Sequence, residues 1–262
     1  MYYILGECDR VAACYLPSNT HTITNEMLTI TRNQRPTADT LIVFDFETTG
    51  LSPDLGDRSI EVGAVLIEGG KITQRFQQLM NPGSRVPVFI ENLTGITNHM
   101  VSQARKNNDV MNDFFEFIGN HNLVAHNAAF DARFLRAELK RIKKSFTGEI
   151  ACSLLASRRL FQQAPNHQLA TLAEYKNLPT QGNYHRALAD AEVTAHLWLS
   201  LLNELQERYE LSSPSFAFMA QLCKTPKHQL NRLFQSAIDN SMSLNGNEVN
   251  GIAFDRHTPT TC

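Results

Sequence analysis

The most informative pattern of apolar and polar positions in the chain lies between residues 41 and 51. It opens with a short apolar run and then places Asp45 and Glu47 where further apolar residues would be expected. Residues two apart on a strand share a face, so the pattern predicts a strand that points both carboxylates one way. Phe44 and Phe46 would point the other way.

Strand-like alternation continues beyond this stretch. After a break at Gly50 to Pro53, every second residue is apolar over 60–67, and a glycine pair then leads into a third segment over 71–80. These three segments predict an antiparallel meander. A further short apolar strand is expected over 123–127.

Helical spacing dominates the rest of the chain. It predicts helices over 88–93, 109–118, 128–144, 153–162, 168–176 and 186–208, and two short amphipathic helices over 215–222 and 226–238. The helix over 128–144 carries a line of basic residues: Arg133, Arg136, Lys140, Lys143 and Lys144. A solvated face is favoured over phosphate contact for this line, because charge runs usually face water.

Composition narrows the classes of function. The 262 residues are 42% hydrophobic, which is enough for a sizeable core, and the net charge of −2 means that any nucleic acid would have to be bound locally. The five cysteines are scattered without a C-x-x-C pair, which argues against a zinc knuckle or a disulfide framework and indicates reduced thiols. With neither a long apolar run nor a signal peptide, we expect a cytoplasmic protein without membrane contact.

Three patches carry candidate chemistry. Two carboxylates held close together repel each other and favour a divalent cation between them, and oxygen ligands favour Mg²⁺ or Mn²⁺ over zinc. For Asp45 and Glu47 alone, solvated acids at a strand end are an equal alternative. The other two patches are Asp131 near the start of one predicted helix, and His185 with Asp190 at the start of another.

Four carboxylates that converge with one histidine would hold two divalent ions and leave a titratable base. In two-metal hydrolysis, ions about 3.5–4 Å apart contact both the attacking and the leaving oxygen. His185 suits the role of base, because the ordinary histidine pKa of about 6.5 lies near working pH. The residues therefore predict metal-dependent phosphodiester hydrolysis.

Three stretches also resemble a known family. They are FDFETTGL at 44–51, VAHNAAFD at 124–131 and HRALADA at 185–191. Together they resemble the three motifs of the DEDDh, or DnaQ-like, 3′-to-5′ exonucleases, whose best-known member is the proofreading epsilon subunit of bacterial DNA polymerase III. Segments 93–97 and 168–178 are also similar to that family, so the resemblance covers about residues 40–207.

The resemblance implies an α/β, RNase H-like exonuclease fold with a central mixed five-stranded sheet, its first three strands antiparallel, flanked by helices. We expect an N-terminal extension over 1–39, a DEDDh exonuclease domain over 40–208, and a C-terminal helical extension over 209–262. The polar composition from Asn240 onward predicts a disordered tail. The two terminal helices could dock on a polymerase, pack on the core or mediate dimerisation, and the sequence leaves these alternatives open.

The resemblance also implies roles for individual residues. The catalytic positions are Asp45, Glu47, Asp131, His185 and Asp190. Of these, the four acids would hold two divalent cations, Mg²⁺ or Mn²⁺, with Asp131 acting directly or through water, and His185 would activate the nucleophile. Contacts to the terminal nucleotide fall on Phe46, Thr48, Thr49, Leu51, His126, Asn127 and Phe130. The residues alone equally allow Leu51 and Phe130 to be core residues and His126 to be a buried hydrogen-bonding group.

The implied activity is 3′-to-5′ release of nucleoside 5′-monophosphates from single-stranded or frayed 3′ ends. DNA is favoured, in proofreading or repair, with a DNA polymerase or another replication or repair protein as a candidate partner of the terminal extensions. An RNA-trimming enzyme of the RNase T or oligoribonuclease type is an alternative, because the metal chemistry does not depend on a 2′-hydroxyl. A third possibility is an inactive nucleic-acid-binding or interaction module. Metal-dependent release of mononucleotides would exclude it.

Overall fold

The computed structural model describes residues 36–180 and 185–247, all within one compact unit. Most of the expected N-terminal extension and the end of the expected tail therefore lie outside the described residues. No helix of the described part is both long and apolar enough to cross a membrane.

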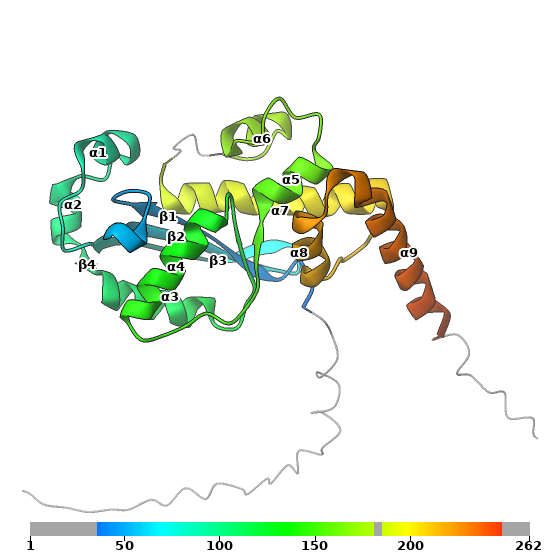
Figure 1. Ribbon diagram of the computed structural model, residues 1–262, viewed down its shortest axis with the longest axis horizontal. Coiled ribbons are helices and arrows are strands. Elements are labelled where there is room, and N and C mark those ends of the chain that lie inside the picture. Colours follow the sequence, from blue (N-terminus) through cyan, green and yellow to red (C-terminus); the bar gives the residue numbers. More distant parts are fainter. Residues whose placement is uncertain (1–35, 181–184, 248–262) are drawn as a thin grey trace, which may run out of the picture. The chain divides into compact units, whose positions relative to one another are not determined.

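A mixed sheet of six strands forms the centre of the described part, in the order β4-β3-β2-β1-β5-β6 (Figure 1). The strands are β1 Leu41–Thr48, β2 Ser59–Glu68, β3 Lys71–Asn81, β4 Arg105–Lys106, β5 Leu123–Ala125 and β6 Ile150–Cys152. The pairs β1–β2 and β2–β3 are antiparallel, which confirms the predicted meander. The other three pairs, β1–β5, β5–β6 and β3–β4, are parallel.

The expected count of five strands is wrong. The sequence pattern placed no strand at β4 or β6, which are two and three residues long. Segments this short cannot display a repeat of two residues, so alternation could not reveal them. Strand β6 is found only by its parallel pairing with β5, a long-range contact.

Helices connect the strands and cover both faces of the sheet. They are α1 Val88–Thr94, α2 Asn98–Gln103, α3 Asn107–Ile118, α4 Ala129–Arg141, α5 Ser153–Leu160, α6 Leu169–Tyr175, α7 Ala187–Tyr209, α8 Phe216–Lys224 and α9 Leu230–Asn247, with short 3-10 turns η1 Pro53–Leu55 and η2 Lys227–Gln229. Helix α2 was not predicted. Helix α9 continues past Asn240, so the expected disordered tail does not begin there. Once the buried part of α9 has formed, each further residue extends the helix at little cost.

Strand β1 separates two apolar clusters. Leu41 and Val43 pack with Trp198 of α7 on one face of the sheet. Phe44 and Phe46 pack with Phe114 of α3 on the other face, which α4 also covers. Because side chains alternate along a strand, the acids of β1 lie on the face opposite Phe44 and Phe46, as the pattern predicted, and this is the face that α7 covers.

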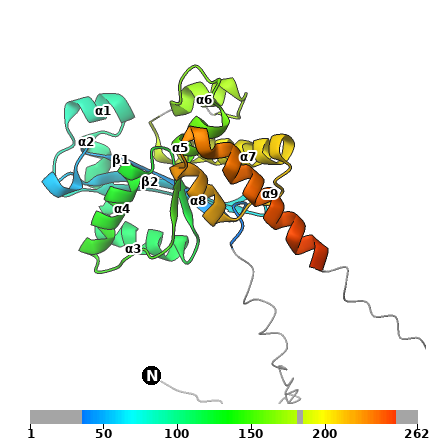
Figure 2. The same ribbon diagram turned by 45° about the vertical axis from the view of Figure 1, so that its right-hand side comes forward.

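The C-terminal helices pack on this core. Phe216 of α8 lies 6.2 Å from Trp198 between ring centroids, and Phe234 of α9 lies 4.0 Å from Tyr209. Both phenylalanines are buried. Of the three alternatives for these helices, packing on the core is the one found for α8 and the start of α9, which lie beside α5 and α7 (Figure 2).

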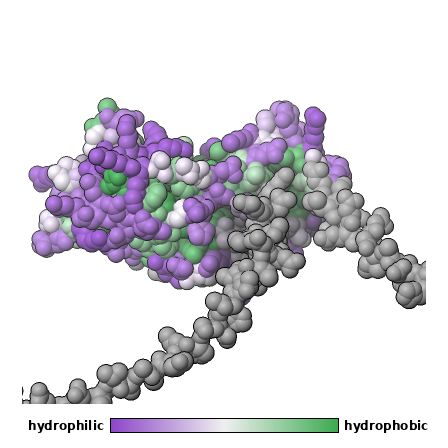
Figure 3. Space-filling view, turned by 90° about the horizontal axis from the view of Figure 1, so that it is seen from below, coloured by the Kyte–Doolittle hydropathy of each residue, from purple (hydrophilic) through white to green (hydrophobic). Residues whose placement is uncertain are grey.

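Apolar residues on the surface of the described part can be followed in a space-filling view. The coloured part of the face seen from below is mostly hydrophilic toward the left, where apolar spots are small, and broader apolar patches lie toward the middle and the right, interrupted by polar residues (Figure 3). The larger apolar side chains that remain exposed belong instead to the segment after β1, to α1 and to α6: Leu51, Leu55, Val88, Phe89, Leu93 and Tyr175.

Candidate active site

The site forms where the end of β1 meets the start of α7. Asp45 pairs across the strands with Gly63 of β2. A Cβ atom at Gly63 would lie 2.0 Å from the backbone nitrogen of Leu188, so only glycine allows α7 to approach β2 this closely. The contact brings the residues at the start of α7 up to the acids of β1.

Helix α4 contributes Asp131 to the site. Asn127 adopts a left-handed backbone with φ of 64°, which asparagine tolerates, and this turn leads from β5 into α4. Asp131 lies in the first turn of the helix and is 2% exposed. Its Oδ1 accepts a hydrogen bond from the backbone N–H of Phe46 at 3.1 Å, which fixes the carboxylate against β1.

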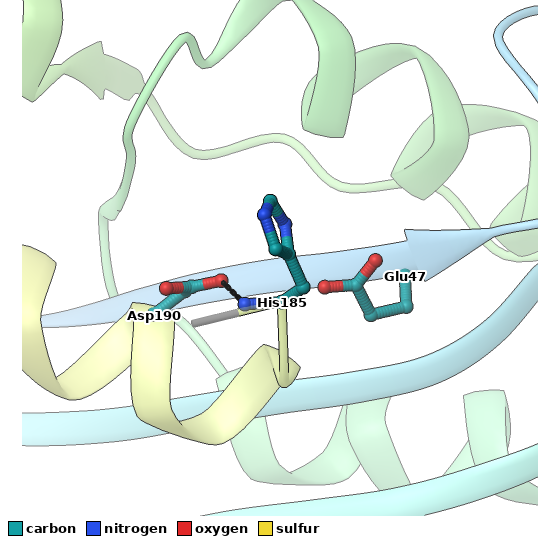
Figure 4. Close-up of side chains that lie close together, drawn as sticks. All are labelled: Glu47, His185 and Asp190. Atoms are coloured by element: carbon teal, nitrogen blue, oxygen red, sulfur yellow. Dashed lines mark hydrogen bonds between the residues drawn. The ribbon is translucent and has the colours of Figure 1, made fainter. Parts of the chain in front are cut away.

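The third motif places His185 beside Asp190. The backbone N–H of His185 donates to Asp190 Oδ2 at 3.0 Å. Glu47, His185 and Asp190 each offer one ligand atom, and these atoms lie within 4.8 Å of one another. Figure 4 shows the two carboxylates on either side of His185, with the imidazole projecting out from between them. The ring belongs to an exposed residue and can meet a substrate.

The carboxylates raise one another's pKa values. Burial, then the charges of Asp131 and Glu47, holds the pKa of Asp45 well above its usual range. Burial is also the main cause that raises the pKa of Glu47 to about 8 and that of Asp131 to about 7, and it raises the pKa of Asp190. These acids resist ionising together unless positive charge is brought among them.

The donor set fits divalent cations. Asp190 Oδ1 is buried and has no hydrogen-bonding partner among the described residues. A buried acceptor without a partner is costly, and a metal ion would satisfy it. An all-carboxylate set with raised pKa values is also the kind that hard cations such as Mg²⁺ and Mn²⁺ prefer.

Two residues that the sequence did not single out hold this site together. Glu61 of β2, directly opposite Glu47, is fully buried and accepts hydrogen bonds from Arg186 at 2.7 and 3.1 Å. It also accepts from the backbone N–H of Ala187 at 3.0 Å, so a carboxylate secures the first residue of α7. The signal of Glu61 in the sequence was an acid on an apolar strand, but its partners, at the start of α7, lie far away along the chain.

Comparisons with known proteins agree with this geometry. A family model described as Exonuclease, RNase_T, matches residues 42–198. The chain belongs to this exonuclease family. It is 35% identical over 171 residues to the DNA polymerase III subunit epsilon of Aquifex aeolicus, a match that covers 65% of this chain and 84% of that protein.

Other relatives are much longer proteins, of which this chain matches only a part. The chain is 40% identical over 166 residues to DNA polymerase III PolC-type of Caldanaerobacter subterraneus, covering 63% of this chain and only 12% of the relative. Among solved structures, Exonuclease X in complex with 5′ overhanging duplex DNA aligns with a TM-score of 0.56 and 26% identity, covering 70% of this chain and 99% of that one. The nuclease domain of 3′hExo, a DEDDh family member bound to rAMP, aligns with a TM-score of 0.54 and 21% identity, covering 63% and 92%, and supports the fold.

The residues expected to contact a nucleotide divide into exposed and buried positions. Leu51 is 76% exposed, so the alternative that it belongs to the core is wrong. Phe130 is partly buried and packs against Phe134 at 5.0 Å between ring centroids. Phe46 and Thr48 are buried, and the Thr48 hydroxyl donates to the carbonyl of Gly50 at 2.6 Å.

Thr49 belongs to a brace around the segment that carries Leu51. Its hydroxyl donates to Asp57 at 3.2 Å and accepts from the backbone N–H of Arg58 at 3.0 Å. Arg58 then binds the buried Glu138 of α4 through Nε at 2.9 Å and a second guanidinium nitrogen at 3.0 Å. The segment after β1 is therefore tied to α4.

His126 has a buried environment in which both ring nitrogens are engaged. Nδ1 lies 2.9 Å from the Ser153 hydroxyl, and Nε2 lies 3.1 Å from the carbonyl oxygen of His167. Burial lowers its pKa to about 4, so the ring is neutral, with Nε2–H donating to the carbonyl and Nδ1 accepting from the hydroxyl. This arrangement matches the alternative of a buried hydrogen-bonding group, linking β5 to the segment before α6.

Proposed function

We propose that the protein is a metal-dependent 3′-to-5′ exonuclease that removes nucleoside 5′-monophosphates from single-stranded or frayed DNA 3′ ends. The observation that carries this proposal is the convergence of Asp45, Glu47, Asp131 and Asp190, all with raised pKa values, beside an exposed His185. A site that resists carrying four negative charges is suited to cations and to the phosphate that they neutralise.

In the proposed reaction, a water oxygen attacks the terminal phosphorus and the bond from phosphorus to the 3′ oxygen breaks. The shortened strand keeps a 3′-hydroxyl, and the released nucleotide keeps the phosphate on its 5′ oxygen. His185 accepts a proton from the attacking water. The four acids would hold two Mg²⁺ or Mn²⁺ ions, which supply charge stabilisation at the attacking and leaving oxygens.

The terminal nucleotide would be held by the segment after β1 and by the start of α4. The exposed Leu51 would contact the terminal base, and Phe46, Thr48 and Thr49 would act mainly through the backbone, since their side chains are buried. Asn127 and Phe130 would complete the contact from the turn into α4. For His126, whose ring nitrogens are both engaged, the contribution would be to position this turn.

DNA is the substrate that the comparisons favour. The two polymerase III relatives are named as DNA polymerase proteins, and the structure with 26% identity is described with duplex DNA. On the same grounds we propose that the exonuclease domain at 40–208 works with a DNA polymerase or another replication or repair protein. The docking segments would be the parts of the terminal extensions other than α8 and the start of α9, which pack on the core.

The test is mononucleotide release from 5′-labelled DNA and RNA oligomers of matched sequence, with Mg²⁺, Mn²⁺ or EDTA. The proposal predicts a ladder that shortens from the 3′ end, requires metal, and forms faster on DNA. Faster shortening of RNA would reassign the enzyme to RNA trimming. No release from either substrate by folded, metal-supplied protein would indicate a binding module instead.

A further inference from the structure

The brace around the segment after β1 ends on a buried carboxylate, that of Glu138 on α4. This side chain is 0% exposed, and it accepts hydrogen bonds from Nε of Arg58 at 2.9 Å and from a second guanidinium nitrogen at 3.0 Å. It also accepts from the backbone N–H of Ser59 at 3.2 Å. A paired contact between a guanidinium and a carboxylate fixes the orientation of both groups as well as their distance. Glu138 therefore holds the start of β2 in a defined position against α4.

Arg58 is also bonded to the segment that follows β1. Its backbone N–H donates to the Thr49 hydroxyl at 3.0 Å, and its carbonyl oxygen accepts from the backbone N–H of Thr49 at 2.9 Å. Asp57 accepts from the Thr49 hydroxyl at 3.2 Å and from the backbone N–H of Ser52 at 3.0 Å. One carboxylate thus holds both ends of the stretch that contains Leu51.

The position of Leu51 depends on these bonds more than on packing. Leu51 is 76% exposed, so contact with the core contributes little to where it lies. A Cβ atom at the neighbouring Gly50 would lie 2.5 Å from the Asp57 carboxylate, so this carboxylate lies directly against the backbone of the segment. The brace is therefore the structure that sets the conformation of the segment 48–52.

The helix that carries Glu138 also carries Asp131 of the acidic site. The two residues are seven apart, or about two turns, and lie on the same side of α4. They are 0% and 2% exposed, and each accepts a backbone N–H from the sheet, that of Ser59 for Glu138 and that of Phe46 for Asp131. Helix α4 is therefore fixed to the sheet at two points, one at the acidic site and one at the brace.

Stability alone does not account for the pair of Arg58 and Glu138. A buried ion pair adds little net stability, because both charges lose their hydration, whereas its directional bonds fix geometry. Arg141 approaches the same carboxylate at 3.5 Å, but it lies on the same helix as Glu138, so this contact does not join two elements. The contact that joins α4 to the segment after β1 is the one made by Arg58.

We propose that Glu138, acting through Arg58, is a positioning residue that holds the segment 48–52 in the conformation that binds the terminal nucleotide. The inference rests on the proposed exonuclease function and assigns a role to residues outside its three motifs. Asp131 keeps its own bond to β1, so the brace controls the affinity for the substrate more than the chemical step. Its loss should therefore change KM more than kcat.

The test compares Arg58→Gln and Glu138→Gln with a matched control, Arg141→Gln. The control removes a cation from the same carboxylate and leaves the link to the segment in place. Both kcat and KM are measured with Mg²⁺ on a single-stranded DNA oligomer, and urea denaturation shows whether each variant is folded in the assay. Binding of a fluorescent DNA oligomer is measured by anisotropy in EDTA. Hydrogen exchange of the backbone amides over 48–58 is followed in the protein without nucleic acid.

Arg58→Gln and Glu138→Gln should each raise KM about ten-fold and change kcat by less than about three-fold, because a displaced segment binds the nucleotide less well. Both should bind the oligomer more weakly, and their amides over 48–58 should exchange faster than those of the wild type. Arg141→Gln should match the wild type in all three measurements.

Three results would overturn the proposal. An equal rise of KM in Arg141→Gln would assign the pair to general stability. Tight binding by Glu138→Gln beside weak binding by Arg58→Gln would mean that Arg58 contacts phosphate itself. A fall in kcat at unchanged KM would mean that the brace acts on the acidic site and not on the segment.

Two further outcomes are also decisive. If Arg58→Gln does not fold, Arg58→Lys is measured in the same way and must raise KM, because lysine keeps the charge and loses the paired contact. If the wild-type protein releases no nucleotide, the proposed function fails, while anisotropy and hydrogen exchange still decide whether the brace positions a segment that binds nucleic acid.

Discussion

At the scale of single residues, Glu47 links the chemistry of the site to its stability. Burial and neighbouring acids raise its pKa from 4.5 to about 8 in the folded protein. Between these two pH values, the folded state holds a proton that the unfolded state has lost. Without metal, the contribution of Glu47 therefore destabilises the fold progressively as pH rises from about 4.5 to about 8.

Replacing Glu47 with glutamine should make the metal-free protein more stable at pH 8. A pKa difference of one unit corresponds to about 1.4 kcal/mol, so we expect a gain of at least about 1 kcal/mol in the free energy of unfolding, fading as pH falls toward 4.5. Thermal denaturation in EDTA at several pH values measures it. Excess Mg²⁺ should reduce the advantage, and the exposed control Glu149→Gln should show none. A Glu47→Gln protein less stable than wild type at pH 8 in EDTA would refute this account of the acids.

At the scale of elements, the start of α7 depends on Glu61. This carboxylate accepts hydrogen bonds from the side chain of Arg186 and from the backbone N–H of Ala187. These two residues directly follow His185. A small displacement of the first turn of α7 would move His185 and Asp190 relative to β1. Misplacement of a reacting group by about 1 Å can lower a rate about 100-fold.

The Glu61→Gln variant should therefore lose about 10- to 100-fold in kcat/KM and need more Mg²⁺ for half-maximal activity. The matched control is Arg75→Ala, which breaks an exposed ion pair, with Glu192, between the sheet and the same helix. Surface pairs contribute little, so the control should stay near wild type. Equal behaviour of the two variants would show that Glu61 does not position the site.

Sequence alone predicted the elements with a clear period and the residues inside three contiguous motifs. Strand β1 and its acids were found because a short apolar run leads directly into two acids that stand two residues apart. Glu61 was missed because its partner Arg186 lies 125 residues away, a separation that no local pattern spans. Helix α2 was missed because its six residues are too short to show a helical period.

At the scale of the whole molecule, the C-terminal helices contribute to the same core as the central sheet. Phe216 of α8 is 1% exposed and joins the cluster that contains Leu41 and Val43 of β1. The sequence could not choose between docking, packing and dimerisation for these helices, because an amphipathic helix has the same pattern in all three cases. The structure shows that α8 packs on the core, because its Phe216 lies against Trp198 of α7.

Truncating this contact should destabilise the whole domain. We expect Phe216→Ala to lower the free energy of unfolding by about 3–5 kcal/mol, the usual range for a buried phenylalanine. The control Phe89→Ala removes a ring that is 65% exposed and should change stability by less than about 0.5 kcal/mol. Urea denaturation of both variants measures the difference. A small effect at Phe216 would mean that α8 folds independently of the sheet.

The most direct test of the central claim is the rate at which Asp45→Asn releases mononucleotides from a DNA 3′ end in saturating Mg²⁺, beside wild type and with both melting curves recorded. Asp45 lies partly buried among the other acids and is replaced by a side chain of the same shape. The account predicts a folded variant whose release rate falls by about 1,000-fold or more, since it loses charge stabilisation that is worth several kcal/mol. A folded Asp45→Asn protein that releases nucleotides at the wild-type rate would contradict the assignment of this acidic cluster as the active site.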